Sequence, residues 1–368
     1  MAEDVGMPVQ LRRDIQWIRL PAGAVYVGNA RQGLVIQDAE VAQEVAQEVA
    51  QLLEPASPHL ALAHSPRAAL VLQRMTDLGF LTKRRVESQH PIKKISDEDL
   101  LRRAAPELDL MLLRDGSGSA GVDRIRARAD FPIVIFGSNR LAYALLALLQ
   151  ATGFTQTSLI NRQRALRGTK ARHPSQSRVS SLLATGLPVR RDSVGNLHTE
   201  VAATVIQGSE LNPPLHYGGP RQPNLENGTS PALIILTQFA APENTQRWMS
   251  EGAAHLAISD WEDSTITVGP LVLPGTTPCS NCVDIARATN NPYLPKVRMM
   301  QSLSEPVEIP AALAAIVSGA VVLGVLEFYE QKNSSWIGAT TEFDALDPCN
   351  PRHSHWQFNS SCGCLEVI

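Results

Sequence analysis

The spacing of apolar and polar residues divides the chain into a short N-terminal part and a longer α/β part. In the N-terminal part, turns rich in glycine and proline separate three apolar, β-branched runs, at residues 15–20, 24–27 and 33–36. This pattern is typical of a short three-stranded meander. Helical spacing then predicts two helices, one from Asp38 to about residue 53 and one over about residues 66–78.

These elements predict a small winged-helix-like α+β domain over residues 1–85. The first helix places on one apolar stripe Val41, Val45, Val49 and Leu52. The second helix has as candidate core positions Leu70, Leu72, Met75 and Leu78. Residues 86–125 are predicted to form a linker that contains a polar helix starting near Ser96 and a glycine-rich joint at 116–121.

The longer part, residues 126–368, opens with a continuous apolar run at 132–136, which predicts a buried parallel strand. Gly137 follows directly, and then come an apolar helix at 141–151 and a second strand at 157–160. A strand, a glycine turn, a helix and a strand in this order predict a Rossmann-like doubly wound sheet. Further elements are predicted as strands at 232–236, 255–259 and 266–272, a helix at 242–252 and a long loop over 205–230.

Composition excludes few classes of protein. Apolar residues make up 44% of the chain and charged residues 19%, as in ordinary globular proteins, and the net charge of −3 argues against a nucleic-acid partner. The N-terminus carries no apolar targeting segment, so we expect a cytoplasmic protein. The apolar segment 309–329 is nearly long enough to span a bilayer, but Glu327 and its many small residues favour a buried helix without membrane contact.

Four of the five cysteines form two close pairs, Cys279 with Cys282 and Cys362 with Cys364. Four thiolates are the ligand set of a closed, tetrahedral structural zinc site, which would stabilise the fold without an open position for catalysis. Four unliganded thiols are the alternative. Cys349 is left over as a free thiol or a nucleophile, and two histidines lie nearby as competing ligands, His353 and His355.

The turn after the first strand of the α/β part lacks most features of a nucleotide site. Phosphate-binding turns need glycines where backbone amides approach the anion, and only Gly137 is present. Asn139 and Ala142 occupy the positions of the second and third glycines. The second strand ends in Asn161-Arg162 where a ribose-binding carboxylate is expected, which argues against NAD and FAD.

The cysteine-containing segments resemble those of a known family. The block GPLVLPGTTPCSNCVD at 269–284 precedes an alanine-rich helix at 310–328 and the ending HSHWQFNSSCGC at 353–364. This order resembles the ThiF/MoeB-like (ubiquitin-activating-like) superfamily. The most similar group is that of the ThiF-like cyclodehydratase partner proteins of thiazole/oxazole-modified peptide biosynthesis. The resemblance covers about 130–368, and it implies that residues 1–85 bind the leader peptide of a precursor.

The resemblance also shows what is missing. Catalytic members of the superfamily adenylate a C-terminal carboxylate with ATP and magnesium, and they carry a magnesium-binding Asp after the fourth strand. Here that position falls near Pro242-Glu243. Positive charge for a degenerate nucleotide site remains available at Arg162, Arg164, Lys170 and Arg247. We therefore expect structural zinc as the cofactor and no ATP.

A peptide-recognition role for the N-terminal domain would work by β-augmentation, in which an extended peptide adds a strand to a sheet edge. The predicted groove consists of Gly33, Leu34, Val35, Ile36, Leu72 and Met75. DNA binding is the competing interpretation of a winged helix. The helix at 66–78 holds only two arginines, Arg67 and Arg74, opposed by Asp77, which is weak support for a DNA-reading helix.

Three hypotheses result. The first is a non-catalytic peptide-binding scaffold that forms a homodimer and presents a leader or tail peptide to a partner modifying enzyme. The second is an ATP-dependent adenylating enzyme that acts on a peptide or carrier-protein C-terminus. The third is a winged-helix DNA-binding regulator.

Overall fold

The computed structural model describes residues 9–11, 15–28, 32–51, 65–83, 103–115, 121–160, 178–184, 188–209, 232–238, 242–259, 261–262, 264–289, 291–292, 294–295, 297 and 308–364. The chain divides into two compact units, Met1–Arg126 and Ala127–Ile368. Each unit has its own sheet and its own buried apolar core.

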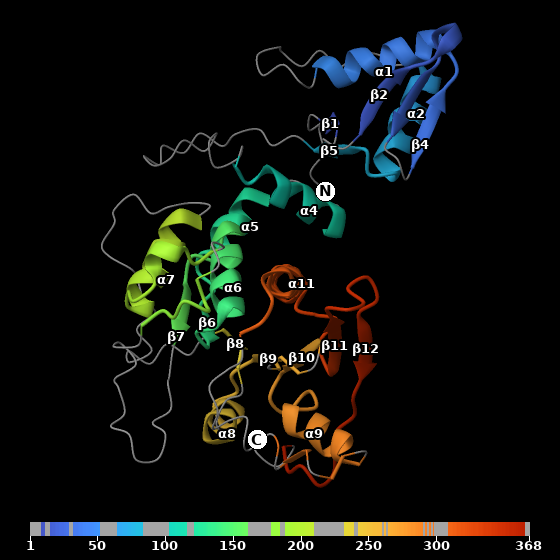
Figure 1. Cartoon of the computed structure of the whole chain (residues 1–368). Helices are drawn as coiled ribbons and strands as arrows, with labels where there is room; N and C mark the ends of the chain where they lie inside the picture. Colours follow the sequence, from blue (N-terminus) through green and yellow to red (C-terminus); the bar gives the residue numbers. More distant parts are fainter. Residues whose placement is uncertain are drawn as a thin grey trace. The chain divides into compact units, whose positions relative to one another are not determined.

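The first unit contains the predicted meander as an antiparallel sheet in the order β2-β3-β4. Its strands are β2 (Gln16–Arg19), β3 (Val25–Gly28) and β4 (Gly33–Ile36), with a 3-10 turn, η1 (Pro21–Gly23), between the first two (Figure 1). A second, two-stranded antiparallel sheet pairs β1 (Val9–Leu11) with β5 (Leu81–Lys83), and neither of these strands is a sequence prediction.

Two amphipathic helices supply the rest of the first unit's core. Both α1 (Ala39–Gln51) and α2 (Pro66–Asp77) start at predicted caps. Asp38 Oδ1 accepts the backbone N–H of Glu40 at 3.0 Å, and Ser65 Oγ accepts that of Ala68 at 3.2 Å. Fully buried on the inner side are Val27, Val45, Ala68, Met75 and Phe80.

The prediction that Leu70 belongs to the core is wrong. Leu70 is 71% exposed, whereas Met75 is fully buried and Leu72 is half-buried against the core. Two residues along an α-helix are about 200° apart around the axis, so Leu70 and Leu72 cannot face the same side. The side chain of Val49 and all of Leu52 lie outside the described residues.

Of the predicted linker, the structure describes α4 (Ala105–Asp115), while the expected helix start at Ser96 and the joint at 116–120 lie outside the described residues. A further helix, α5 (Gly121–Arg128), precedes the large sheet.

The second unit is built on a seven-stranded sheet in the order β12-β11-β10-β9-β8-β6-β7. Four strands run parallel, and they are β6 (Ile133–Phe136), β7 (Thr157–Ile160), β8 (Leu233–Leu236) and β9 (His255–Ile258). Three more run antiparallel to their neighbours, and they are β10 (Thr265–Val272), β11 (Ala339–Asp344) and β12 (Arg352–His355). The predicted Rossmann-like sheet is therefore present, as a mixed sheet.

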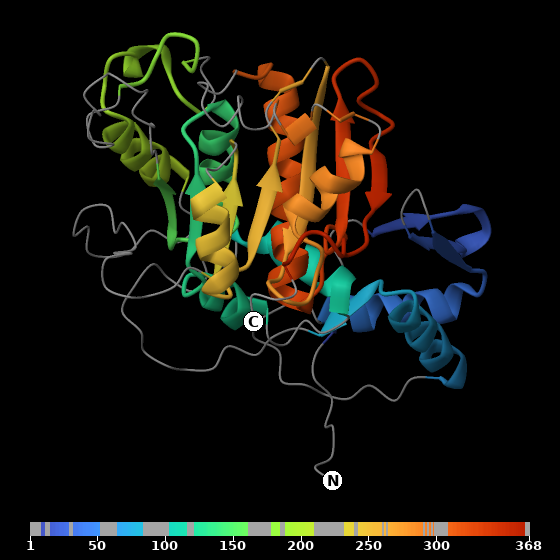
Figure 2. The ribbon, with the colours of Figure 1, turned by 90° about the horizontal axis from the view of Figure 1, so that it is seen from below.

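Helices cover both faces of this sheet, as the prediction of a doubly wound fold requires. On one face lie α6 (Arg140–Ala151) and α11 (Ala311–Gln331), and on the other α8 (Pro242–Ser250) and α9 (Ser280–Ala288) (Figures 1 and 2). A fifth helix, α7 (His198–Ser209), packs against α6 after a 3-10 turn, η4 (Arg191–Ser193).

The predicted loop over 205–230 is wrong at its start, because α7 continues to Ser209. Buried Val201 and Val205 lie four residues apart and supply the apolar side of the helix. The remaining part of the predicted loop, from 210 onward, lies outside the described residues.

The apolar segment expected to be a buried helix is α11. By length and composition it could cross a membrane, with a mean hydropathy of 2.2, and half of it is buried inside the protein. A side chain at Gly324 would collide with the ring of Trp336, so at least this small residue serves packing within the subunit. The two cysteine pairs flank α11 in sequence and meet in one cluster, which is incompatible with a single crossing.

A buried ion pair fastens α5 to the end of α11. The side chains of Arg128 and Glu330 are 0% and 5% exposed, and their charged atoms are 2.6 Å apart. Arg128 also donates to the carbonyl of Thr152 at the end of α6, at 2.7 Å. One guanidinium thus connects three helix ends.

Arg128→Ala is expected to lower the free energy of unfolding by about 3–5 kcal/mol, because it breaks a pair between two buried charges. The matched control is Arg247→Ala, which removes an exposed pair with Glu251 on α8. It should cost less than about 1 kcal/mol. Denaturant unfolding of both variants measures the difference, and equal costs would contradict the role given to Arg128.

Candidate functional site

The four cysteines of the two pairs form one cluster, as their spacing predicts. Their sulfur atoms all lie within 4.8 Å of one another. Neighbouring sulfurs are 3.4 Å apart for Cys279–Cys362, 3.5 Å for Cys282–Cys364 and 4.0 Å for Cys279–Cys282. Four thiolates at 2.3 Å from one tetrahedral zinc ion would be separated by about 3.8 Å, so the cluster fits a metal ion of this kind.

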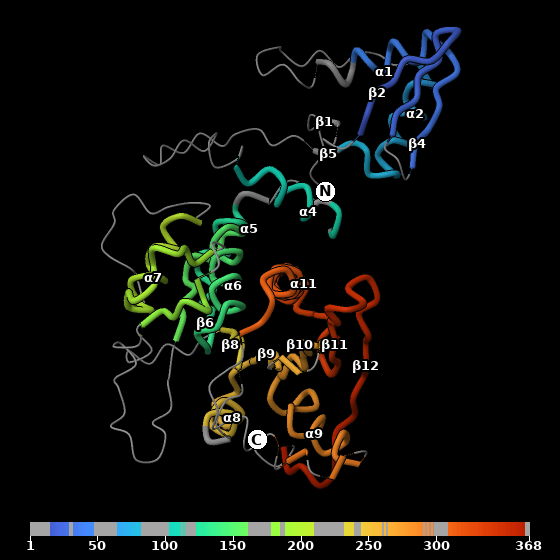
Figure 3. The backbone as a smooth tube through the Cα atoms, viewed as in Figure 1, coloured from blue at the N-terminus to red at the C-terminus, as the bar shows by residue number. Residues whose placement is uncertain are grey.

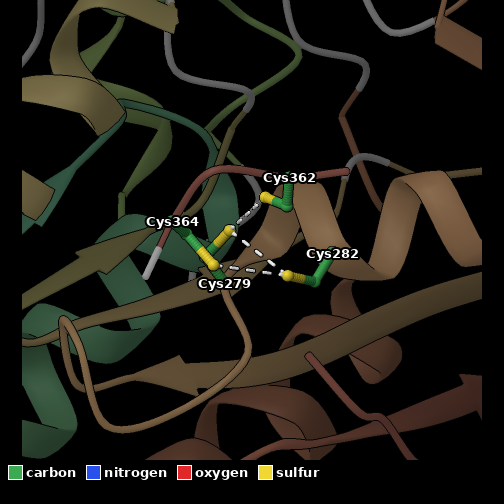
Figure 4. Close-up of side chains that lie close together, drawn as sticks. All are labelled: Cys279, Cys282, Cys362 and Cys364. Atoms are coloured by element: carbon green, nitrogen blue, oxygen red, sulfur yellow. Dashed lines mark hydrogen bonds between the residues drawn. The ribbon is translucent and has the colours of Figure 1, made fainter. Parts of the chain in front are cut away.

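Local structure aims the four thiols at one point (Figure 4). Cys279 is the N-cap of α9, and Cys282 lies one turn into that helix. The other two come from the loop after β12, which returns to the start of α9 (Figure 3). Gly363, with φ +72°, allows the tight turn that directs Cys362 and Cys364 to the same side.

The surroundings of the cluster raise the pKa of two of the thiols and lower that of a third. Burial raises the pKa of the Cys279 thiol, and burial together with neighbouring thiols raises that of Cys364 to about 11. Burial acts in the same direction on Cys282, but the N–H of Asn359 and the adjacent thiols outweigh it and lower its pKa. The amide of Asn281 donates to Cys362 Sγ at 3.2 Å. A metal ion would therefore have to displace protons from most of these thiols.

The cysteine cluster lies at the end of the sheet opposite to the usual ligand-binding edge. It packs against Val272, the last residue of β10, which pairs with His255, the first residue of β9. Ligands of open α/β sheets bind at the carboxyl ends of the parallel strands. The position of the cluster is therefore that of a structural site, which fastens the segment after β12 to the sheet.

The other candidate ligands lie apart from this cluster. Cys349 is exposed, in the turn between β11 and β12. His353 and His355 lie on the edge strand β12, with ring centroids 4.9 Å apart. His353 Nδ1 is 2.9 Å from the hydroxyl of Thr341. Within the described residues, the four paired cysteines are the only group of three or more potential ligands close enough to hold one ion.

The predicted degenerate nucleotide site lies where the order of the parallel strands reverses, between β6 and β8. Gly137 has φ +144°, and a side chain there would collide with the hydroxyl of Thr237 from the end of β8. Its N–H donates to the carbonyl of Ile160 at 3.0 Å. The glycine is thus required by packing between strands.

Asn139 completes the closure of this crevice. It caps α6 by accepting the N–H of Ala142 at 3.0 Å, and its amide donates to the carbonyl of Thr237 at 2.5 Å. Thr237 N–H in turn donates to the carbonyl of Phe136 at 3.0 Å. Asn139 and Thr237 are both buried. Asn139 and Thr237 therefore use these polar groups within the protein's own structure.

A carboxylate from a distant part of the chain occupies the start of α6. Glu308 Oε2 accepts the backbone N–H of Arg140, the first helical residue, at 3.0 Å across a sequence separation of 168 residues. The side chain of Arg140 donates to the carbonyls of Ile309 and Leu182. Burial raises the pKa of Glu308, opposed by the N–H and the charge of Arg140.

The cationic residues expected around the nucleotide site are only partly described. Arg162, Arg164 and Lys170 lie outside the described residues. Arg247 pairs with Glu251 of its own helix at 2.7 Å. Pro242 and Glu243 open α8, and the structure does not describe their side chains.

The predicted peptide-binding residues lie on β4 and α2 of the first unit. In the described part of the chain, β4 pairs only with β3, so its outer edge carries no further strand. Leu34 and Leu72 are half-buried against the core, and Val35 is exposed. Gly33 leaves room for the ring of Tyr26. The side chains of Ile36 and Met75 are buried, so they can shape this surface but cannot contact a ligand.

Sequence reasoning missed two residues of the second unit, Thr237 and Glu308. Thr237 follows an apolar strand and has no special spacing. Glu308 precedes an apolar helix and contacts a residue 168 positions earlier. No short-range pattern in the sequence connects either residue with the turn at Gly137.

Known proteins resemble this chain in structure but show no match in sequence. No protein-family model matches the chain, and no curated protein matches its sequence. A Rossmann-like mixed sheet with a four-cysteine cluster, preceded by a small antiparallel sheet, is the ThiF-like fold, as the sequence predicts.

Solved structures with this fold match nearly the whole chain. Escherichia coli MccB with MccA-N7isoASN has a TM-score of 0.63 at 13% identity, covering 97% of this chain and 99% of that chain. The microcin C7 biosynthetic enzyme MccB in complex with N-formylated MccA has a TM-score of 0.62 at 14% identity, with 97% and 99% covered. PaaA has a TM-score of 0.58 at 15% identity, with 94% and 99% covered. The closer resemblance to the cyclodehydratase partner proteins stays a prediction.

We expect the purified protein to contain one zinc ion per chain, which metal analysis measures. Cys362→Ser should lose the metal and about 3 kcal/mol of stability, as when a ligand present at about 100 times its Kd is removed. The matched control is Cys349→Ser, at the exposed cysteine, which should keep both metal and stability. Metal-free wild-type protein with unchanged stability would contradict the assignment.

Proposed function

We propose that this protein is a peptide-binding scaffold without nucleotide chemistry. The observation that carries the proposal is the outer edge of β4, which pairs with no described strand, in a unit that also has the half-buried apolar residues Leu34 and Leu72. Similarity to MccB supports it, because it extends over 97% of this chain and includes complexes of MccB with a peptide.

Peptide capture would follow from the unpaired backbone groups of β4. An extended peptide that pairs with this edge satisfies main-chain donors and acceptors, which gives affinity without sequence preference. Specificity would come from side chains that cover the exposed parts of Leu34 and Leu72. A leader or tail peptide with apolar residues at alternate positions is the ligand that fits this surface.

The closed switch point supports the absence of ATP chemistry. Asn139 and Thr237 pair with each other, and Glu308 presents a negative charge where phosphate would bind. A bound phosphate would have to displace this carboxylate or lie beside it, and like charges at such a distance repel. The second unit would then act as a platform that presents the peptide to a modifying enzyme.

An adenylating enzyme is the second candidate. The observation in its favour is that MccB is named as a biosynthetic enzyme and has been solved with ATP. In this candidate, Arg162 and Lys170 would supply positive charge for the phosphates of ATP, because Arg247 is paired with Glu251. Pyrophosphate exchange that depends on a peptide carboxylate would distinguish the adenylating enzyme from the scaffold.

The homodimer and the partner enzyme remain part of the proposal. The exposed apolar residues of α11, Ile316 and Leu323, are where a second subunit would pack. We expect the protein to act in the cytoplasm.

Calorimetry with ATP and magnesium tests the nucleotide part. We expect no binding heat at millimolar ATP, because the polar groups at the end of β6 are already paired. Micromolar binding would overturn the scaffold and favour the adenylating enzyme.

The peptide part is tested with peptides selected from a displayed random library on the full chain. Leu72→Ala should weaken their binding about tenfold, a loss of about 1.4 kcal/mol, because it removes apolar area from the proposed groove. Leu70→Ala is the matched control on the opposite side of α2, and it should leave affinity unchanged. Circular dichroism checks that both variants are folded. Equal effects would exclude this groove.

A further inference from the structure

At the start of α6, a partly buried carboxylate contacts a helix N-terminus. Glu308 accepts the N–H of Arg140 at 3.0 Å and is half-buried. The first backbone N–H groups of a helix have no partners within the helix, and the helix dipole adds positive potential there. In nucleotide-binding α/β sheets, these groups bind phosphate.

The segment that carries Glu308 is held at this position by independent contacts. The guanidinium of Arg140 donates to the carbonyl of Ile309, the residue after Glu308, and also to that of Leu182. Ile309 itself is buried. The backbone then enters α11, which packs along α6. The carboxylate therefore belongs to a fixed segment with several attachment points.

Two other described polar side chains at the switch point also serve the protein's own structure. The side chain of Asn139 satisfies the N–H of Ala142, and Thr237 occupies the space beside Gly137. Glu308 supplies a carboxylate at the position where the helix start would otherwise attract an anionic ligand.

We propose that Glu308 is a built-in substitute for the nucleotide phosphate, an intramolecular anion that closes the switch point and holds α11 against the start of α6. This inference rests on the proposed function, in which no nucleotide is used. It adds a cause for the lack of nucleotide binding, which is that the chain's own carboxylate occupies the phosphate position. The absence of phosphate-binding glycines is then only one part of the explanation.

The test is rescue by inorganic phosphate, measured as the shift in melting temperature of full-length protein. Glu308→Ala removes the carboxylate that accepts the N–H of Arg140 at a partly buried position. We expect the variant to melt below wild type and to regain stability with phosphate. Its affinity for phosphate should exceed that of wild type at least tenfold. Potassium chloride at equal ionic strength is the control for general salt effects.

Glu200→Ala is the matched control variant. Glu200 accepts the N–H of Leu197 at 3.1 Å at the start of α7, where it is exposed, so water can replace it. This variant should respond to phosphate as wild type does. A response of Glu308→Ala no larger than that of Glu200→Ala would overturn the proposal.

Glu308→Gln keeps the proposal testable if the alanine variant does not fold. The amide oxygen can still accept the N–H of Arg140 but carries no charge, so we expect a folded protein with phosphate affinity above that of wild type. Equal affinities of Glu308→Gln and wild type would overturn the role of the charge. Tight ATP binding by the wild-type protein would instead overturn the proposed function. If neither wild type nor Glu308→Ala responds to phosphate, only this inference is overturned.

Discussion

Burial of β6 on both faces is the constraint on which the second unit depends. All four of its side chains, Ile133 to Phe136, are buried, between the neighbouring strands β7 and β8 and the covering helices. A strand of this kind can exist only as a central member of a sheet with helices on both faces. The turn that follows it, at Gly137, must therefore emerge at the switch point, where the fold concentrates the groups that bind ligands.

At this point the protein has used its polar groups for its own structure. Asn139 connects the start of α6 to the end of β8, and Glu308 connects it to the start of α11. The four-cysteine cluster lies at the other end of the sheet, next to the first residue of β9. The second unit thus has two internal fastenings at opposite ends. The proposed role as a platform for a captured peptide requires a stable second unit and no open crevice.

The features predicted correctly from sequence alone are those whose signal lies in neighbouring residues. The caps Asp38 and Ser65, the apolar run of β6 and the two cysteine pairs each carry their information within a few residues. The strand β12 escaped prediction because its sequence, Arg-His-Ser-His, is polar and its side chains are exposed at the edge of the sheet. Leu70 was misplaced because an apolar residue next to a helical stripe can still face water.

By itself, the sequence determined that the chain has a small α+β domain, a Rossmann-like sheet and a four-thiol ligand set, because hydrophobic period and short cysteine spacing are properties of neighbouring residues. It also determined that the phosphate-binding glycines are missing. Only the tertiary structure decided which group contacts the start of α6. The contact of Glu308 with Arg140 spans 168 residues, and no periodicity connects positions so far apart. Such contacts depend on how helices pack on the sheet, which is a property of the folded chain.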